Sequence, residues 1–227
     1  RLSREEARGL PTLALLWQLT GERHYAEAGI RLLEAWTDGR AKGYGPERYL
    51  GNVSVMYDLL YDAMTPEQRA EIGRAILDGV YGRRKLPIMG YNLSSFFFIF
   101  KCVGLLAIYG DGIDDEKVRD LWEGEYEYLT EKFLPDYRVL SKRRGGWLDS
   151  MHCGCFEEYH VPFFWFLSNA TGHNYFESEM VLKGMGTWYV YNIFRFGPGA
   201  NCNVVPVSSI YHGGVRWKGN IGTPICA

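Results

Sequence analysis

The chain has 227 residues, of which 47% are hydrophobic and 23% are charged, and its formal net charge at pH 7 is -2. These values are ordinary for a globular protein, and the length suits one large domain with a sizeable core. The slightly acidic balance lacks the excess of basic residues that a nucleic-acid-binding surface needs. The longest apolar run, residues 94–106, is too short to span a membrane and contains Lys101. We therefore expect neither nucleic acid nor membrane as a partner, and the oligomeric state stays open.

Periodic apolar residues predict a series of helices, interrupted by glycine-rich and basic loops. In chain order the expected helices cover residues 3–19, 22–36, 47–63, 65–80, 92–109, 114–133, 149–168 and 177–194. The fourth has the strongest start signal, with Thr65 as N-cap, Pro66 at N1 and Gln68 at N3. Pro162 marks a kink or break in the seventh helix. Residues 197–227 lose the helical period, and Val204–Val207 suggests a short strand.

A helical-hairpin pattern occurs three times. In residues 15–25 an apolar helix runs into Thr20-Gly21, and a second helix starts with Tyr25 just beyond the turn. Residues 166–175 repeat this pattern around a second Thr-Gly pair, and residues 105–112 are a looser copy. Repeated antiparallel helix pairs bury their apolar faces against one another and form toroids or solenoids.

The predicted fold is therefore all-α. We expect residues 1–196 to form an incomplete (α/α) toroid of about four antiparallel helical hairpins. Residues 197–227 are expected to form a short loop and β-like C-terminal segment that leads into a β domain.

Three stretches carry a family resemblance. The first is the Leu-Thr-Gly-Glu turn of residues 19–22, and the second is the Y-D-L-L-Y-D-A-M-T-P-E-Q-R run of residues 57–69. The third is G-G-W-L-D-S at residues 145–150, which precedes Thr171-Gly172 at the expected distance. Together these stretches resemble the toroid of heparinase II/III-like and alginate-lyase-like polysaccharide lyases, and the resemblance spans most of residues 1–194.

That resemblance implies β-elimination on an anionic, uronic-acid-containing polysaccharide, with no cofactor and no metal strictly needed. A base removes the proton beside the uronate carboxyl, a neutraliser stabilises the growing charge, and an acid protonates the leaving glycosidic oxygen. The family also implies a periplasmic or secreted protein. The chain begins at Arg1 and shows no signal peptide, so we interpret it as an excised or processed piece.

The candidate neutraliser is Asn92. The family places an amide and a His at the start of a helix like residues 92–109, and here Tyr91-Asn92-Leu93-Ser94 supplies the amide without the His. The backbone N–H groups of such a helix start also favour an anion. In the alternative, Asn92 or Ser94 simply caps the helix.

The candidate base and acid lie after the G-G-W motif. The family's Tyr slot falls at His152 or Cys153, and the next tyrosine is Tyr159, between Glu158 and His160. Either Tyr159 acts with His152 or His160 nearby, or His152 has taken the role, or the site is degenerate. Tyr159 packed in the core, with His160 capping a helix or lining a loop, is the structural alternative.

Basic loops precede both candidate catalytic segments and suit the carboxylates or sulfates of a polyanion. Residues 82–87 contain Arg83 and Arg84, and residues 142–147 contain Arg143, Arg144 and Trp147, the last a sugar-stacking candidate. The further candidate substrate-binding residues are Tyr91, Glu158 and His212. We expect Trp165 and Trp188 to lie in the core.

Three rival interpretations remain. His152-Cys153-Gly154-Cys155 contains zinc-type ligands, but its spacing is unusual for structural zinc and we assign no metal. A catalytically degenerate, carbohydrate-binding relative fits the departures from both catalytic motifs. A toroid glycoside hydrolase would use carboxylates such as Asp149, Glu157 and Glu158, although no well-separated acidic pair is visible.

Overall fold

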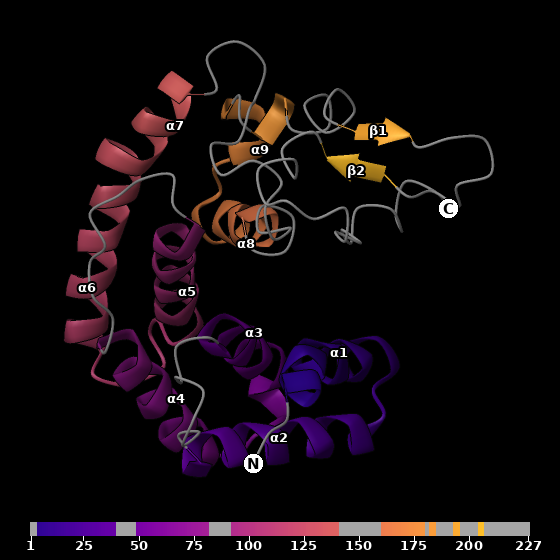
Figure 1. The fold of residues 1–227 in the computed structure, drawn as a ribbon. Coiled ribbons are helices and arrows are strands. Elements are labelled where there is room, and N and C mark those ends of the chain that lie inside the picture. Colours follow the sequence, from indigo (N-terminus) through magenta and orange to yellow (C-terminus); the bar gives the residue numbers. More distant parts are fainter. Residues whose placement is uncertain are drawn as a thin grey trace. The chain divides into compact units, whose positions relative to one another are not determined.

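The structure is a computed structural model, and it describes residues 4–39, 49–81, 92–140, 160–179, 182–184, 193–195 and 204–206. Almost all of the elements in these ranges are helices, which confirms the all-α prediction (Figure 1). They are α1 (Arg4–Thr20), α2 (Arg23–Gly39), α3 (Leu50–Leu60), the 3-10 helix η2 (Tyr61–Ala63), α4 (Pro66–Tyr81), α5 (Asn92–Ala107), α6 (Asp115–Tyr128), the π-helix η3 (Leu129–Phe133), α7 (Leu134–Leu140), α8 (Val161–Thr171) and α9 (Tyr175–Ser178). None of these helices has the length and apolar character needed to cross a lipid bilayer.

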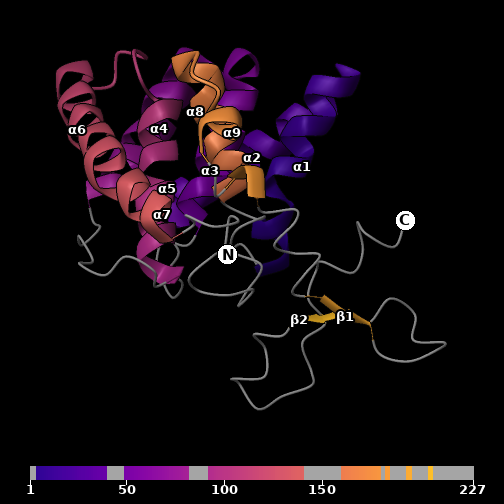
Figure 2. The ribbon, with the colours of Figure 1, turned by 90° about the horizontal axis from the view of Figure 1, so that it is seen from above.

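The exception is a two-stranded antiparallel ladder. Strand β1 (Ile193–Arg195) pairs with β2 (Val204–Pro206), and Phe194 lies opposite Val205 in the register. The strands lie side by side in both Figure 1 and Figure 2. Strand β2 confirms the strand predicted at Val204–Val207.

The chain divides into two compact units. The first comprises Arg1–Leu86 and Phe97–Glu127, and the second comprises Pro87–Phe96 and Tyr128–Ala227. The predicted division at residue 196 falls outside the described residues, so it stays a prediction.

Helix α3 is central to the packing of the first unit. It contacts α1, α2 and α4 (Figure 1), and it is apolar on most sides because it lies among them. A Cβ built on Gly51 would lie 2.5 Å from Cδ1 of Phe100, so this glycine permits the close approach of α3 and α5. Side chains with at most 1% exposure form the core around it: Leu33, Leu50, Met56, Tyr57, Leu60, Ile72, Ile76 and Ile99.

The turn between α1 and α2 explains why Thr-Gly ends a helix. The Thr20 hydroxyl donates to the carbonyl of Leu16 at 2.7 Å and accepts from the N–H of Glu22 at 3.1 Å. Gly21 adopts the left-handed conformation with φ 68°, and its N–H bonds to the carbonyl of Trp17 at 2.8 Å. Together these bonds satisfy groups that a helix terminus otherwise leaves unpaired.

The turn between α8 and α9, in the second unit, repeats this arrangement. The Thr171 hydroxyl donates to the carbonyl of Leu167 at 2.7 Å and accepts from the N–H of His173 at 3.3 Å. Gly172 has φ 72°, and its N–H bonds to the carbonyl of Ser168 at 2.9 Å. The hairpin pattern in residues 15–25 and 166–175 therefore has one structural cause.

The start of α4 confirms the predicted cap. The N–H of Gln68 donates to the Thr65 hydroxyl at 3.3 Å, and the N–H of Thr65 donates to Oε1 of Gln68 at 2.9 Å. This reciprocal pair is a capping box, with Pro66 as the first residue of the helix.

The predicted end of the sixth helix at residue 133 is wrong. The helical run continues through η3 and Pro135 to Leu140. In η3 the N–H of Leu134 bonds to the carbonyl of Leu129, five residues back, which widens the turn directly before the proline. Pro135 is the second residue of α7, and the first turn of a helical segment tolerates a proline, which has no backbone N–H to donate.

The prediction of one continuous helix over residues 177–194 is also wrong. Helix α9 ends at Ser178, the described residues 182–184 are helical again, and β1 occupies Ile193–Arg195. The helix ends because Glu179 turns to extended dihedral angles, φ -99° and ψ 116°. Pro162 lies in the first turn of α8, and residues 141–159 before it are outside the described ones, so the predicted kink or break stays a prediction.

Substituting the turn glycine should cost stability through the backbone alone. A Cβ on Gly21 meets nothing within 4 Å, so Gly21→Ala should lower the free energy of unfolding by about 1–2 kcal/mol because φ is positive. Gly124, inside α6, also has no atom within 4 Å, and Gly124→Ala should raise that free energy by up to about 1 kcal/mol. Urea unfolding of both variants tests this, and equal effects would contradict the assignment of the turn.

Candidate functional site

Two of the four predicted catalytic residues lie in the described part of the chain. Asn92 is the first residue of α5, as predicted, and its side chain lies outside the described residues. His160 immediately precedes α8, and its side chain does not cap that helix. Its exposed fraction is 0%, so in this conformation His160 can act on a polymer only by orienting a neighbour.

The remaining candidates are outside the described residues, and their roles stay predictions. They are Tyr159, His152, Arg83, Arg84, Arg143, Arg144, Trp147, Tyr91, Glu158 and His212. Trp188 and the His152-Cys153-Gly154-Cys155 segment lie there too. Within the described residues, no group of three or more His, Cys, Asp or Glu side chains could hold a metal ion.

The prediction that Trp165 lies in the core is wrong. Trp165 lies in α8 with 57% of its surface exposed, while Phe163, Phe164 and Leu167 of the same helix are buried. The apolar run of residues 161–167 has more apolar side chains than one buried helix face can hold, so one of the large ones remains exposed.

A polar cluster lies within the first unit, and its residues come from two of the sequence patterns. The Tyr57 hydroxyl donates to Oδ2 of Asp111 at 2.9 Å, which joins α3 to the turn after α5. Tyr61 also hydrogen-bonds to Asp111, and its ring stacks edge-on against Tyr57 with centroids 5.9 Å apart. The Arg69 guanidinium lies over the Tyr61 ring at 4.1 Å. The sequence analysis assigned these residues to a motif (57–69) and a turn (105–112), but it did not predict that they contact one another.

Burial sets the ionisation of this cluster. Burial and the hydrogen bond to Asp111 raise the pKa of Tyr57 far above its usual value, so its phenolate is not accessible. Burial also raises the pKa of the Asp111 carboxyl, although the hydrogen bonds from Tyr57 and Tyr61 oppose this. The Asp58 side chain is exposed, but partial desolvation of its carboxyl and the negative charge of Asp111 raise its pKa. A tyrosine held neutral in this way is a poor base, and the cluster is therefore a structural connection.

A second buried connection joins α5 to α6 in the first unit. Nζ of Lys101 lies 2.5 Å from Oε1 of Glu125, and both side chains are largely buried. Cys102, the next residue, is also buried, and burial together with the charge of Glu125 raises its pKa. A thiol held protonated is unreactive, so Cys102 is a packing residue.

The second unit contains an ion pair that sequence reasoning missed. Nη2 of Arg138 lies 2.7 Å from Oε1 of Glu179, and Nε of Arg138 lies 3.1 Å from Oε2. The pair joins α7 to the residue after α9. No local signal could reveal it, because the two residues are 41 positions apart and residue 179 was assigned to the interior of a helix.

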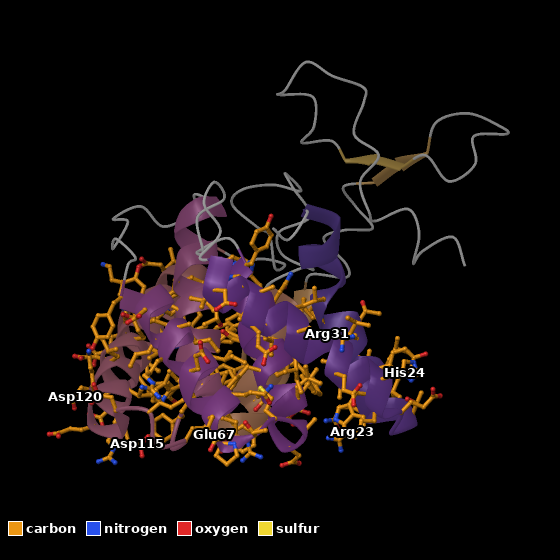
Figure 3. All side chains as sticks on the ribbon, turned by 90° about the horizontal axis from the view of Figure 1, so that it is seen from below. Arg23, His24, Arg31, Glu67, Asp115 and Asp120 are labelled. Carbon is orange, nitrogen blue, oxygen red and sulfur yellow. The ribbon has the colours of Figure 1, made fainter. Side chains whose placement is uncertain are left out.

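The described residues of the first unit also form a groove between the end of α2 and α4. Four carboxylates line it, together with one basic residue, Arg74, whose Nε donates to the carbonyl of Ala70. The carboxylates are Asp38, Glu67, Glu71 and Asp78. Glu67 lies at the outer edge of this unit in Figure 3, and hydrogen bonds from its own backbone N–H and from Thr65 lower its pKa. A groove of this charge repels a polyanion.

Comparison with known proteins found no matching family model, no matching curated protein and no matching solved structure.

Neutralising Asp58 should stabilise the protein, and the gain should depend on pH. A carboxyl whose pKa is higher in the folded chain stabilises the fold while it is protonated. That stability is lost as the pH rises from the ordinary value of 3.8 through the raised value. Asp58→Asn should therefore raise the midpoint of thermal unfolding at pH 7 and have a smaller effect near pH 3.

The matched control is Asp120→Asn, an exposed aspartate of α6 that points to the outside of the first unit in Figure 3. It should shift the midpoint little at either pH. A lower midpoint for Asp58→Asn at pH 7 would contradict the raised pKa.

Proposed function

We propose that this chain carries the (α/α) toroid of a polysaccharide lyase that cleaves a uronic-acid-containing anionic polysaccharide by β-elimination. The observation that carries this proposal is the agreement between the quoted motifs and the local structures they form. The Thr-Gly motifs end helices by one hydrogen-bond scheme in both units, and the T-P-E-Q motif forms a capping box. The first Thr-Gly motif joins two full helices, α1 and α2, that pack against each other as a helical hairpin, the building unit of such a toroid.

The reaction makes specific demands on the side chains. The carbon acid beside a uronate carboxyl is weak, so hydrogen-bond donors have to face the carboxylate where negative charge grows. In this proposal the Asn92 amide fills that role. Its place at the first residue of α5 adds the unpaired N–H groups of a helix N-terminus, which favour an anion.

The proton transfers are assigned to Tyr159, which removes the proton beside the carboxyl and protonates the leaving oxygen. His152 is the candidate for direct assistance. His160 is completely buried, so its proposed role is to orient its neighbour Tyr159. Tyr91, Glu158, Trp147 and His212 complete the proposed substrate contacts.

Substrate docking is assigned to the basic loops, with Arg83, Arg84, Arg143 and Arg144 as partners for carboxylates or sulfates. The acidic groove between α2 and α4 supports this choice, because it disfavours the same ligand. From the family resemblance we also propose that the protein is periplasmic or secreted.

Ultraviolet absorbance during incubation with heparan sulfate, chondroitin, hyaluronan, alginate and pectate tests the proposal. Elimination leaves a conjugated double bond in the new sugar end, so absorbance should rise with at least one polymer. Tyr159→Phe should reduce the rate by about 100-fold or more, because it removes the group that transfers the protons. Tyr109→Phe is the matched control, since Tyr109 is an exposed tyrosine of the first unit, and it should leave the rate unchanged.

The outcome also separates the rival functions. A flat trace with new reducing ends would indicate a glycoside hydrolase. A flat trace without new ends, from a folded chain and across all polymers, would indicate a carbohydrate-binding relative without turnover.

A further inference from the structure

The Arg138–Glu179 pair combines a buried anchor with an accessible cation. Only 1% of the Glu179 side chain is exposed, whereas 57% of the Arg138 side chain is exposed. The carboxylate of Glu179 is therefore buried within the second unit, and the side chain of Arg138 is exposed at the surface of that unit.

The geometry of the pair leaves part of the guanidinium available. Glu179 accepts from Nε and from Nη2, which are two of the five N–H donors of an arginine. The other donors, on Nη1 and on the outer side of Nη2, form a second planar fork. Such a fork matches a carboxylate or sulfate with two parallel hydrogen bonds.

Holding the side chain in place makes it a better ligand-binding group. A free arginine loses rotamer entropy when it binds an anion, but Arg138 is already ordered by its bidentate bond to Glu179. The ion pair also raises the pKa of Arg138, so the cation persists at any physiological pH.

The residues that follow Arg138 in the sequence indicate which kind of ligand it would bind. Arg138 lies in the last turn of α7, four residues before Lys142, and Arg143 and Arg144 follow. Lys142, Arg143 and Arg144 give the stretch of sequence after Arg138 an excess of positive charge in an otherwise slightly acidic chain. We propose that Arg138, positioned by Glu179, binds a carboxylate or sulfate of the anionic polysaccharide. This inference rests on the proposed function and adds a binding residue to it.

The test is the affinity of the 227-residue chain for polyanions by titration calorimetry. Alginate oligosaccharide supplies carboxylates, dextran sulfate supplies sulfates, and uncharged dextran is the blank. The main variant, Arg138→Gln with Glu179→Gln, removes both charges and keeps a neutral hydrogen-bonded pair, so no unpaired buried carboxylate remains. We expect it to lose about tenfold in affinity for a charged polymer, with its circular dichroism unchanged. Arg31→Gln, at an exposed arginine of α2, is the matched control and should change affinity less than about twofold.

Two single variants separate binding from positioning. Arg138→Lys keeps the charge but has no fork, and we expect an intermediate loss of affinity with unchanged salt dependence. Glu179→Gln keeps Arg138 but weakens its anchor, and we expect a smaller loss that appears only with the charged polymers. A loss for alginate alone assigns a carboxylate ligand, and a loss for dextran sulfate alone assigns a sulfate.

Wild-type affinity in the folded double variant would overturn the proposal, as would a wild-type chain that binds neither polyanion. If the double variant does not fold, Arg138→Lys decides, and wild-type affinity there overturns the proposal equally. Binding that depends on Arg138 without any rise in absorbance would support this inference while the lyase proposal failed.

Discussion

A buried polar group without a partner costs free energy, and three buried pairs that avoid this cost join elements within the two units of this chain. The Tyr57 hydroxyl is completely buried and finds its acceptor in Asp111, Lys101 pairs with Glu125, and Glu179 pairs with Arg138. Each pair joins different helices or a helix and a turn, so each specifies which elements lie together. Removing one partner would leave a buried polar or charged group without compensation, at a cost of about 1–3 kcal/mol for a neutral group and more for a charge. Burial of apolar side chains supplies most of the stability of each unit. The buried polar pairs determine which elements contact each other within it.

The predictable part of the fold is the part that short stretches of sequence determine. Thr20-Gly21 and Thr171-Gly172 end helices because a hydroxyl and a glycine meet the needs of the turn within a few residues. The same holds for Thr65 and Gln68 at the start of α4. The polar pairs were not predictable, since 54 residues separate Tyr57 from Asp111 and only the folded chain brings them together. The end predicted at residue 133 was wrong because apolar periodicity does not reveal the π-turn that carries the helical run past this point. Trp165 misled the prediction because composition gives no indication of which large side chain a helix leaves exposed.

For the candidate site too, local motifs were predictable and contacts between distant residues were not. The resemblance identified Asn92, Tyr159 and the basic loops through local motifs, and the described structure places Asn92 at the start of α5. It could not identify Arg138, which lies outside every quoted motif and whose importance depends on its anchor, Glu179. The acidic groove and the Arg138–Glu179 pair differ in the charge that they present to a ligand. The acidic groove of the first unit disfavours a polyanion, and in our proposal an exposed cation of the second unit binds one.

The central claim is that the chain breaks a polyuronate by elimination, and the origin of the oxygen at the new reducing end tests it most directly. Elimination leaves the glycosidic oxygen on the released sugar, whereas hydrolysis takes that oxygen from water. Products formed in water enriched in heavy oxygen, and reduced with borohydride at once so that the anomeric oxygen does not exchange, should therefore carry no label when analysed by mass spectrometry. Before that reduction, their summed mass should equal that of the substrate. Heavy oxygen in the new reducing ends, with one water added for each cleavage, would contradict the claim.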